Sequence, residues 1–336
     1  MPSYFHWLVF FIVTLSLGLN QQAIAAKKKQ KPLESLPTVV PAPDDNLTTL
    51  GKVELGRQLF FDVRLSGNNQ MSCATCHLPD KAFADGQPQA LGQAGRKLSR
   101  NTPSLLNVAF LPSYFWDGRA KTLEEQALEP VKSPEEMNQN LDELEQELRD
   151  IPGYVKQFAD VFGSQITRER IAQSLAAFQR SLVTKPAPFD RFLAGEKDAI
   201  SATAKRGLEL FQGGAACVRC HRGPLLSDGG FYRLGVAGED EGLLAVTHTP
   251  ADRGKFRTPP FRNIAQTGPY MHNGSMKSLN EVVTYYYRGV PTTSSDGLPL
   301  DVQPLFGQSF SEIADLVAFL ETLSGEIPHI EPPTLP

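Results

Sequence analysis

Cys73-Ala-Thr-Cys76-His77 is the stretch that decides the fold, and Cys217-Val-Arg-Cys220-His221 repeats its pattern. Cys-x-x-Cys-His is the attachment signature of a c-type haem, in which two thiols add to the porphyrin vinyl groups and the histidine becomes the proximal iron ligand. The two motifs contain all four cysteines of the chain. The sequence therefore predicts two covalent c-type haems, with His77 and His221 as iron ligands.

Paired cysteines also occur in zinc ribbons and in redox dithiols. The separation between Cys76 and Cys217 far exceeds the usual zinc-ribbon gap, and zinc leaves both following histidines unexplained. A thioredoxin-like site is expected near a βαβ pattern, and none is evident. Both interpretations are weaker than that of a dihaem cytochrome.

The amino-terminal residues carry the pattern of an export signal. The apolar run 5–19 precedes a small-residue stretch, which predicts a signal peptide over residues 1–26 and a periplasmic location. An uncleaved membrane anchor is the alternative, although the run is shorter than the ~20 residues that a span needs. Residues 27–44 form a basic and proline-rich linker.

Composition indicates an ordinary globular protein with an acidic balance. The chain has 336 residues, 41% of them hydrophobic, which is enough for two domains with their own cores. Residues 27–31 hold four of the 33 basic residues, so 29 remain against 37 acidic ones. Such a surface disfavours nucleic acid and suits a basic protein partner.

An internal repeat aligns the two motifs. Residues 101–130 align without gaps on residues 257–286, which follow by 156 positions, and each motif is preceded by Gly-x-x-Leu-Phe. We therefore expect a mostly α fold with two cytochrome c-like haem domains, residues 45–195 and 196–330, related by duplication and wrapped around the haems by long loops.

Helix signals predict several helices within these domains. One, from 134 to 148, is expected to begin after Ser133 as N-cap, with Pro134 at the first helical position. Another is expected to begin with a Ser278 to Glu281 capping box. The predicted ranges are 47–61, 134–148, 167–184, 202–212, 279–288 and 310–323.

The repeat register pairs Trp116 with His272, Gln126 with Val282, and Pro130 with Tyr286. Proline cannot bind iron and a phenol oxygen can, so Tyr286 is a candidate ligand of the second haem. The first haem is then open to substrate, and the second is closed for electron transfer.

Two alternatives to this ligand assignment stay open. In the first, Tyr285, Tyr286 and Tyr287 are all packing aromatics; if Tyr286 binds iron, this interpretation applies only to Tyr285 and Tyr287. Met271 and Met276 are rival ligands, because methionine is a common sixth ligand in c cytochromes.

A series of motifs in order resembles the bacterial dihaem cytochrome c peroxidases and their MauG-like relatives. The resemblance implies that the amino-terminal haem reacts with hydrogen peroxide. It implies that the carboxy-terminal haem takes electrons from a small donor protein, a c cytochrome or a cupredoxin. The motifs are "LGRQLFFDVRLSGNNQMSCATCH", "RNTPSLLN", "FWDGRAKTLEEQALEP", "EEM" and "TGPYMHNGS".

The family's distal residues fall on Gln126, Pro130 and Glu136. By the resemblance, Glu136 moves a proton between the two peroxide oxygens and Gln126 orients the peroxide. Locally, Glu136 is also explained as an acid in the first turn of a helix, a place that Glu135 fills equally well. The resemblance also places Trp116 between the haems as an electron-transfer residue, where ordinary core packing is the alternative.

The family's calcium ligands, an asparagine side chain and two backbone carbonyls, fall on Asn101, Thr267 and Pro269. Hard oxygen ligands suit that ion, but the same residues are also typical of loops. Further candidates are haem-propionate partners, and the alternative for the arginines is an ordinary surface position. Those candidates are Arg257, Arg262 and His272, whereas His248 and His329 are expected in solvent.

Two departures separate the chain from the peroxidase pattern. Many family peroxidases rest with a loop histidine bound to the first haem, but residues 78–220 contain no histidine. Tyr286 stands where peroxidases usually carry methionine and MauG-like enzymes carry tyrosine. A phenolate lowers the haem potential and favours storage of oxidising equivalents as high-valent iron.

The sequence thus predicts an exported dihaem peroxidase that reduces hydrogen peroxide with electrons from a donor protein. The alternative is a MauG-like enzyme that oxidises a protein or a small molecule. A non-catalytic dihaem electron carrier is a third hypothesis, which the Gln126, Pro130 and Glu136 set disfavours. A homodimer is a further candidate assembly.

Overall fold

The protein is described by a computed structural model that covers residues 32–291, 293–294, 297–302 and 310–336. The predicted signal peptide and the first residues of the linker lie outside this part of the chain. Residues 31–336 form one compact unit. The limits of the two haem domains therefore stay a prediction.

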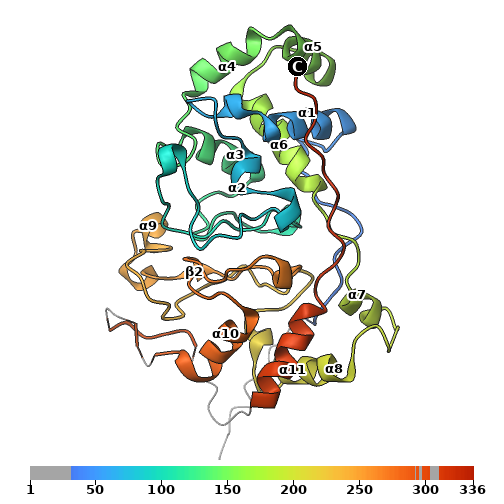
Figure 1. Ribbon diagram of the computed structural model, residues 1–336, viewed down its shortest axis with the longest axis vertical. Helices are drawn as coiled ribbons and strands as arrows, with labels where there is room; N and C mark the ends of the chain where they lie inside the picture. Colours follow the sequence, from blue (N-terminus) through green and yellow to red (C-terminus); the bar gives the residue numbers. More distant parts are fainter. Residues whose placement is uncertain (1–31, 292, 295–296, 303–309) are drawn as a thin grey trace, which may run out of the picture. The chain divides into compact units, whose positions relative to one another are not determined.

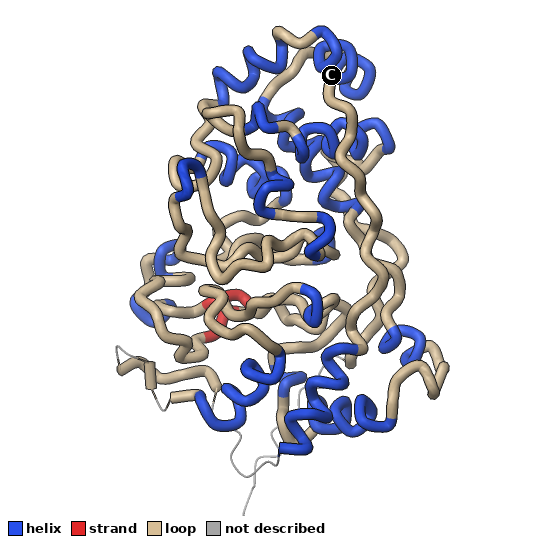
Figure 2. The backbone as a smooth tube through the Cα atoms, in the orientation of Figure 1, coloured by secondary structure: helices blue, strands red, loops and turns tan. Residues whose placement is uncertain are grey.

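Among the described residues, nearly all regular secondary structure is helical, which confirms the mostly α fold. Figure 2 shows that the chain between α2 and α3, and between α8 and α10, is mostly loop. The strands β1 (Phe231–Tyr232) and β2 (Phe256–Arg257) form an antiparallel pair. The α-helices are α1 Leu50–Phe61, α2 Cys73–Cys76, α3 Leu123–Lys132, α4 Leu141–Arg149, α5 Pro152–Phe162, α6 Arg168–Ser181, α7 Pro188–Leu193, α8 Ala202–Gln212, α9 Leu244–Thr247, α10 Leu279–Thr284 and α11 Phe310–Glu321.

One close helix crossing organises each half of the chain. In the first half α1 packs on α6, and in the second α8 packs on α11, as Figure 1 shows. A β-carbon on Gly56 of α1 would lie 1.9 Å from the carbonyl oxygen of Ser174, and one on Gly207 of α8 would lie 1.9 Å from that of Asp315. The glycine of each Gly-x-x-Leu-Phe motif therefore lets the two backbones touch.

Each crossing supports its own hydrophobic core. The first core is built from buried residues between Leu55 and Leu182, and the second from residues between Phe189 and Leu323. The chain ends cross over: Leu33 packs in the second core, while Ile327 packs on the first. Figure 1 shows the carboxy-terminal segment running past α7 and ending near α5. The ends therefore tie the two cores together.

The duplication predicted from sequence is confirmed in the backbone and in its hydrogen bonds. The bridge between Tyr114 and Ala120 recurs 156 residues later between Tyr270 and Met276. The amide of Lys121 donates to the carboxylate of Glu125, and the equivalent bond recurs in the second half from Lys277 to Glu281. Both halves are therefore versions of one structural unit.

The helix predicted over 134–148 is wrong at its amino-terminal end. Ser133 is the C-cap of α3, residues 134–137 form a turn, and α4 begins at Leu141. The reason is a competing cap, because the side chain of Asn140 accepts hydrogen bonds from the amides of Asp142 and Glu143. Glu136 thus lies in a turn.

Three helices, α3, α5 and α7, were not predicted from the sequence, whereas α8 has the predicted bounds. The predicted helix 279–288 changes character at Tyr285, where a π-helical turn runs to Gly289. Among the described residues, no helix has both the length and the apolar character needed to cross a bilayer.

Replacing Gly56 with alanine should destabilise the first half, because the new methyl group meets backbone that cannot move away. We expect a cost of about 1–3 kcal/mol, as for other overpacked sites, measured by denaturant unfolding of the holoprotein. Gly51→Ala on the same helix is the control, since its β-carbon meets only a valine side chain at 3.2 Å. Equal stability of the two variants would contradict the close crossing.

Candidate active site

The first haem motif forms a short helix with its histidine directly after it. α2 carries both cysteines, and the amide of Ser72 donates to the hydroxyl of Thr75 at 3.0 Å, which fixes the start of the turn. Nδ1 of His77 lies 2.9 Å from the carbonyl oxygen of Phe83. A metal-binding histidine commonly donates its other ring N–H to such a carbonyl, which leaves Nε2 for the metal.

The second motif repeats this arrangement. Nδ1 of His221 lies 3.0 Å from the carbonyl oxygen of Leu226, and its ring stacks on Phe261 with centroids 3.6 Å apart. Burial lowers the pKa of both motif histidines, that of His221 to about 4. Both imidazoles are therefore neutral at pH 7, the form that binds iron.

A cavity of about 980 Å³ is lined by both motifs. The four cysteines are not bridged as disulfides, so their thiols are free for attachment. Mostly apolar walls with a few polar groups suit a large flat aromatic cofactor. The thiols, the oriented neutral histidines and the size of the cavity together fit two c-type haems.

In the first half α3 carries two of the predicted distal residues. Gln126 and Pro130 both line the cavity. Pro130 lies inside α3 and has no N–H, so the carbonyl of Gln126 lacks its usual helical donor. Proline at this position also gives the wall of the cavity no group that could bind iron.

Glu136 lines the same cavity from the turn after α3. Burial raises the pKa of its carboxyl group, against an opposing effect of the Arg119 charge. Among the described residues, none donates a hydrogen bond to its carboxylate, and only burial and nearby charges act on it. The carboxyl group is therefore exposed to the cavity rather than bound to protein.

In the second half the three neighbouring tyrosines lie in three different environments. Tyr286 lines the cavity, and burial raises the pKa of its phenol. The hydroxyl of Tyr285 donates to the carbonyl of Leu234 at 2.9 Å, and Tyr287 is buried in the second core. The π-helical turn rotates these side chains out of α-helical register, a feature often found at functional sites.

The two methionines that are rival iron ligands differ in their position relative to the cavity. Met271 lines the cavity, and Met276 is absent from its lining, with its backbone paired to Tyr270. Met271 therefore remains a geometric rival of Tyr286, and the identity of the sixth ligand stays a prediction.

Trp116 and His272 lie where the two halves meet, held by hydrogen bonds that the repeat relates to each other. The amide of Asn101 donates to the carbonyl of His272 at 2.7 Å, and 156 residues later the amide of Arg257 donates to the carbonyl of Trp116 at 2.8 Å. The indole Nε1 donates to the carbonyl of Asn101 at 2.9 Å. Trp116 is therefore fixed by both halves.

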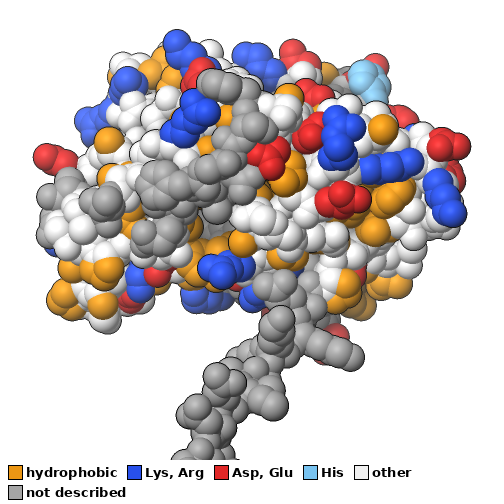
Figure 3. All heavy atoms as spheres, turned by 90° about the horizontal axis from the view of Figure 1, so that it is seen from below, with side chains coloured by type: hydrophobic (Ala, Val, Ile, Leu, Met, Phe, Trp, Pro, Cys, Tyr) orange, Lys and Arg blue, Asp and Glu red, His pale blue; other side chains and the backbone are white. Residues whose placement is uncertain are grey.

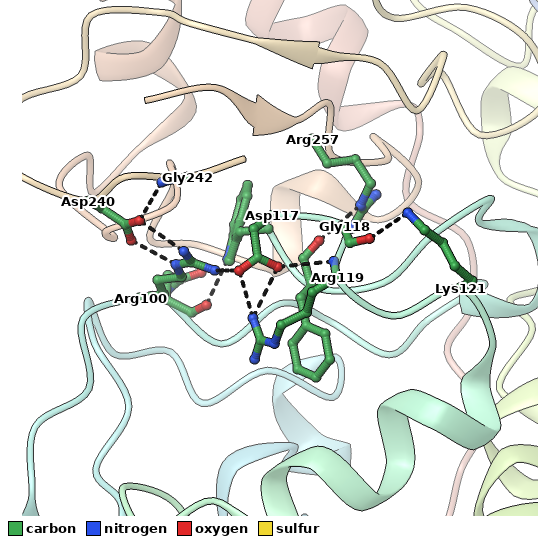
Figure 4. A network of polar contacts seen from close by, with 11 residues as sticks. Arg100, Asp117, Gly118, Arg119, Lys121, Asp240, Gly242 and Arg257 are labelled. Atoms are coloured by element: carbon green, nitrogen blue, oxygen red, sulfur yellow. Dashed lines mark hydrogen bonds and ion pairs between the residues drawn. The ribbon is translucent and has the colours of Figure 1, made fainter. Parts of the chain in front are cut away.

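Figure 4 shows an ion-pair network around Asp117, the residue after Trp116, which was not predicted from the sequence. Arg100 donates to Asp117 at 2.6 Å and forms a two-pronged pair with Asp240 at 2.7 and 2.9 Å. Arg119 also binds Asp117, and its guanidinium lies 3.5 Å from the centre of the Phe115 ring. Arg100 thus joins the two halves. The "WDGR" motif contained Asp117 and Arg119, but no sequence signal pairs Arg100 with a residue 140 positions away.

The other predicted residues divide into buried and exposed groups. Arg257 and Arg262 are each 5% exposed and line the cavity, so the surface alternative is wrong for both. Arg262 pairs with Asp190 at 2.6 Å. His272 is buried and stacks on Phe256, whereas His248 and His329 are exposed, as expected. Propionate binding by these residues stays a prediction.

The three candidate calcium residues share one property, a place in the lining of the cavity. Asn101, Thr267 and Pro269 all line it, although the side-chain amide of Asn101 also donates to the carbonyl of Gln87 at 2.8 Å. Among the described residues, no cluster of three histidine, cysteine or acidic side chains could hold a metal, but carbonyl ligands would not form such a cluster. Calcium therefore stays a prediction.

Two haem-attachment sites around one cavity, on a duplicated helical scaffold, define a dihaem c-type cytochrome. A family model described as di-haem cytochrome c peroxidase matches residues 51–198. The methylamine utilization protein MauG of Methylorubrum extorquens is 42% identical over 328 residues, which cover 96% of this chain and 91% of that protein. The chain therefore belongs to the dihaem cytochrome c peroxidase and MauG family, and it is an oxidoreductase.

Two further comparisons agree with this membership. Cytochrome-c peroxidase IdrP1 of Pseudomonas sp. strain SCT is 38% identical over 365 residues, which cover 98% of this chain and 95% of that protein. The crystal structure of a MauG-like protein associated with microbial copper homeostasis superposes with a TM-score of 0.77 at 33% identity, covering 87% of this chain and 95% of that one. Both branches of the family are thus represented among its relatives.

Replacing Asp240 with asparagine should weaken the joint between the halves. Burial alone would raise the pKa of Asp240, but the bonds from Arg100 and the amide of Gly242 outweigh it, so the pKa is lowered. Its contribution is thus present above the unfolded carboxyl pKa and lost as pH falls through the folded one. At pH 7 we expect a loss of about 1.5–3 kcal/mol in chemical unfolding.

The control is Glu241→Gln, which removes the adjacent, exposed acid paired with Arg253 at 3.4 Å. Such a surface pair contributes about 0–1 kcal/mol. A cost for Asp240→Asn that matches the control, or that persists unchanged at strongly acidic pH, would contradict the role of the network.

Proposed function

We propose that the protein reduces hydrogen peroxide to water at its amino-terminal haem, with electrons that enter at the carboxy-terminal haem. The asymmetry between repeat-equivalent positions carries this proposal. Gln126 and Pro130 in the first half correspond to Val282 and Tyr286 in the second, and all four line the cavity. The first half thus places a polar amide and a proline, which cannot bind iron, along the cavity, whereas the second half places a phenol there.

When bound, the haem of the first half supplies the iron at which peroxide is held and the electrons that reduce it. Glu136 accepts the proton from one peroxide oxygen and returns it to the other, so that water leaves instead of hydroxide. Its free carboxylate supports this role, because a base already engaged by protein donors would be a weaker proton acceptor. Gln126 donates a hydrogen bond that orients the peroxide, and Trp116 carries electrons between the halves.

The first haem should be open to peroxide without prior reduction. No histidine occurs between residues 78 and 220, so the loop after the first motif cannot supply a blocking imidazole. Pro130 supports the same conclusion, because it occupies the position equivalent to Tyr286 and has no group that could bind iron.

A MauG-like oxidation of a protein or a small molecule is the second candidate function. Tyr286 favours it, since a phenolate stabilises ferric iron and makes the second haem a poor electron acceptor. The 42% identity to a MauG protein supports this candidate as well. Under this hypothesis the electron donor is replaced by the molecule that is oxidised, a protein or a small molecule.

We further infer a periplasmic enzyme that binds one calcium ion at Asn101, Thr267 and Pro269 and receives electrons from a c cytochrome or a cupredoxin. On the face seen in Figure 3, acidic and basic side chains are interspersed with apolar ones. A face of this mixed kind suits a transient protein partner. A homodimer remains part of this proposal.

Replacing Glu136 with glutamine should lower kcat/KM for peroxide by about 100- to 10,000-fold, the usual contribution of general acid–base catalysis. In the parent enzyme the rate should fall as pH drops through a carboxyl pKa above the ordinary 4.5, because the base must be ionised. Glu135→Gln, the exposed neighbour, is the matched control. Parental turnover in Glu136→Gln would contradict the role of Glu136 as the catalytic base.

Replacing Tyr286 with phenylalanine should alter the ferric low-spin absorption and EPR spectrum of the carboxy-terminal haem, since one iron ligand is lost. Tyr286→Met should instead raise the potential of that haem. Tyr285→Phe serves as control, because its hydroxyl binds the carbonyl of Leu234. An unchanged spectrum in Tyr286→Phe would eliminate Tyr286 and leave Met271.

A further inference from the structure

The turn that carries Glu136 is enclosed by two glycines from separate segments of the first half. A β-carbon on Gly92 would lie 1.8 Å from the carbonyl oxygen of Glu135, and one on Gly67 would lie 2.1 Å from that of Asn138. A backbone carbonyl oxygen in a turn cannot move aside by rotating, as the end of a side chain can. Each glycine therefore marks a place where two backbones touch.

Backbone torsion does not explain these glycines. Gly92 has a φ of −82°, which any residue adopts, and Gly67 does not belong to the glycines with positive φ. The requirement at both positions is therefore one of space. The same contacts are reinforced by hydrogen bonds on both sides of the turn.

From one side, the amide of Gln93 donates to the carbonyl of Glu136 at 2.7 Å, and from the other the amide of Gly67 donates to the carbonyl of Met137 at 2.9 Å. The side-chain amide of Asn138 reaches Gln93 at 3.1 Å. Within the turn, the amide of Glu136 donates to the carbonyl of Ser133 at 3.1 Å. Both backbone polar groups of Glu136 are thus bound, in contrast to its carboxylate.

We propose that Gly67 and Gly92 are positioning residues that clamp the backbone of this turn and thereby aim the carboxylate of Glu136 into the cavity. The proposal rests on the catalytic role proposed for Glu136. Because no described protein group holds the carboxylate itself, its place in the cavity depends on the backbone beneath it. A side chain at either glycine pushes the turn away from its neighbour and moves the carboxylate with it.

The test compares Gly92→Ala and Gly67→Ala with Gly51→Ala, a glycine of the same half whose β-carbon meets only a side chain. Each clamp variant should lose about 100-fold in kcat/KM for peroxide, the loss that a misplacement of about 1 Å can cause. Haem absorption should keep its parental form. The acid limb of the pH profile should move to lower pH, since a displaced carboxylate is less buried; a purely structural loss would lower the rate equally at all pH values.

Asn138→Gly provides a variant without a steric clash, since Asn138 has a φ of 49° that glycine adopts easily. It removes only the bond to Gln93 and should lower kcat/KM about two- to tenfold. Parental kinetics and an unmoved acid limb in this variant, or in the folded alanine variants, would overturn the clamp.

Glu136→Gln separates this failure from failure of the proposed function. If Glu136→Gln is inactive while the clamp variants keep parental rates, only the clamp is wrong. If Glu136→Gln retains parental turnover, the catalytic role and the clamp are both overturned. Adding Gly92→Ala to Glu136→Gln should cause no further loss, because both changes act on one group.

Discussion

The hydrogen bond from each motif histidine to a backbone carbonyl is the constraint on which the rest of this structure depends. His77 and His221 follow their cysteines directly, and their Nδ1 atoms are held by Phe83 and Leu226. With one ring nitrogen fixed, the other has a single direction for iron. Both histidines line the cavity, so these two directions decide where iron can be bound within it.

A symmetric scaffold carries an asymmetric site. The paired backbone hydrogen bonds at Trp116 and His272 show how closely the halves correspond, since equivalent residues exchange equivalent bonds across their junction. At the repeat-equivalent positions of Pro130 and Tyr286 the two halves nevertheless place different groups along the cavity. The different functions proposed for the two haems therefore depend on differences between repeat-equivalent residues that line one cavity.

The haem-attachment sites and several helix boundaries could be predicted from sequence, because the patterns that indicate them are local. The attachment motifs and the helix cap at Ser278 each depend on residues close together in the chain, and the repeat is recognised by its constant spacing of 156 positions. The structure agrees with these patterns. The helix predicted after Ser133 failed because Asn140 is the stronger cap, which left Glu136 in a turn. Arg100 with Asp240, and the contacts of Gly92, could not be predicted, because each joins segments that only the folded chain brings together.

The central claim is that the first haem reacts with peroxide in the fully ferric protein, without prior reduction. Its most direct test is peroxide-dependent oxidation of reduced cytochrome c by the purified holoprotein, first in the fully ferric form and then after half-reduction. The account predicts rapid turnover in the ferric form, without an activation step. Turnover that appears only after half-reduction would contradict it. Absence of turnover in both forms, with peroxide still shifting the haem absorption, would contradict the peroxidase assignment and favour oxidation of a partner protein.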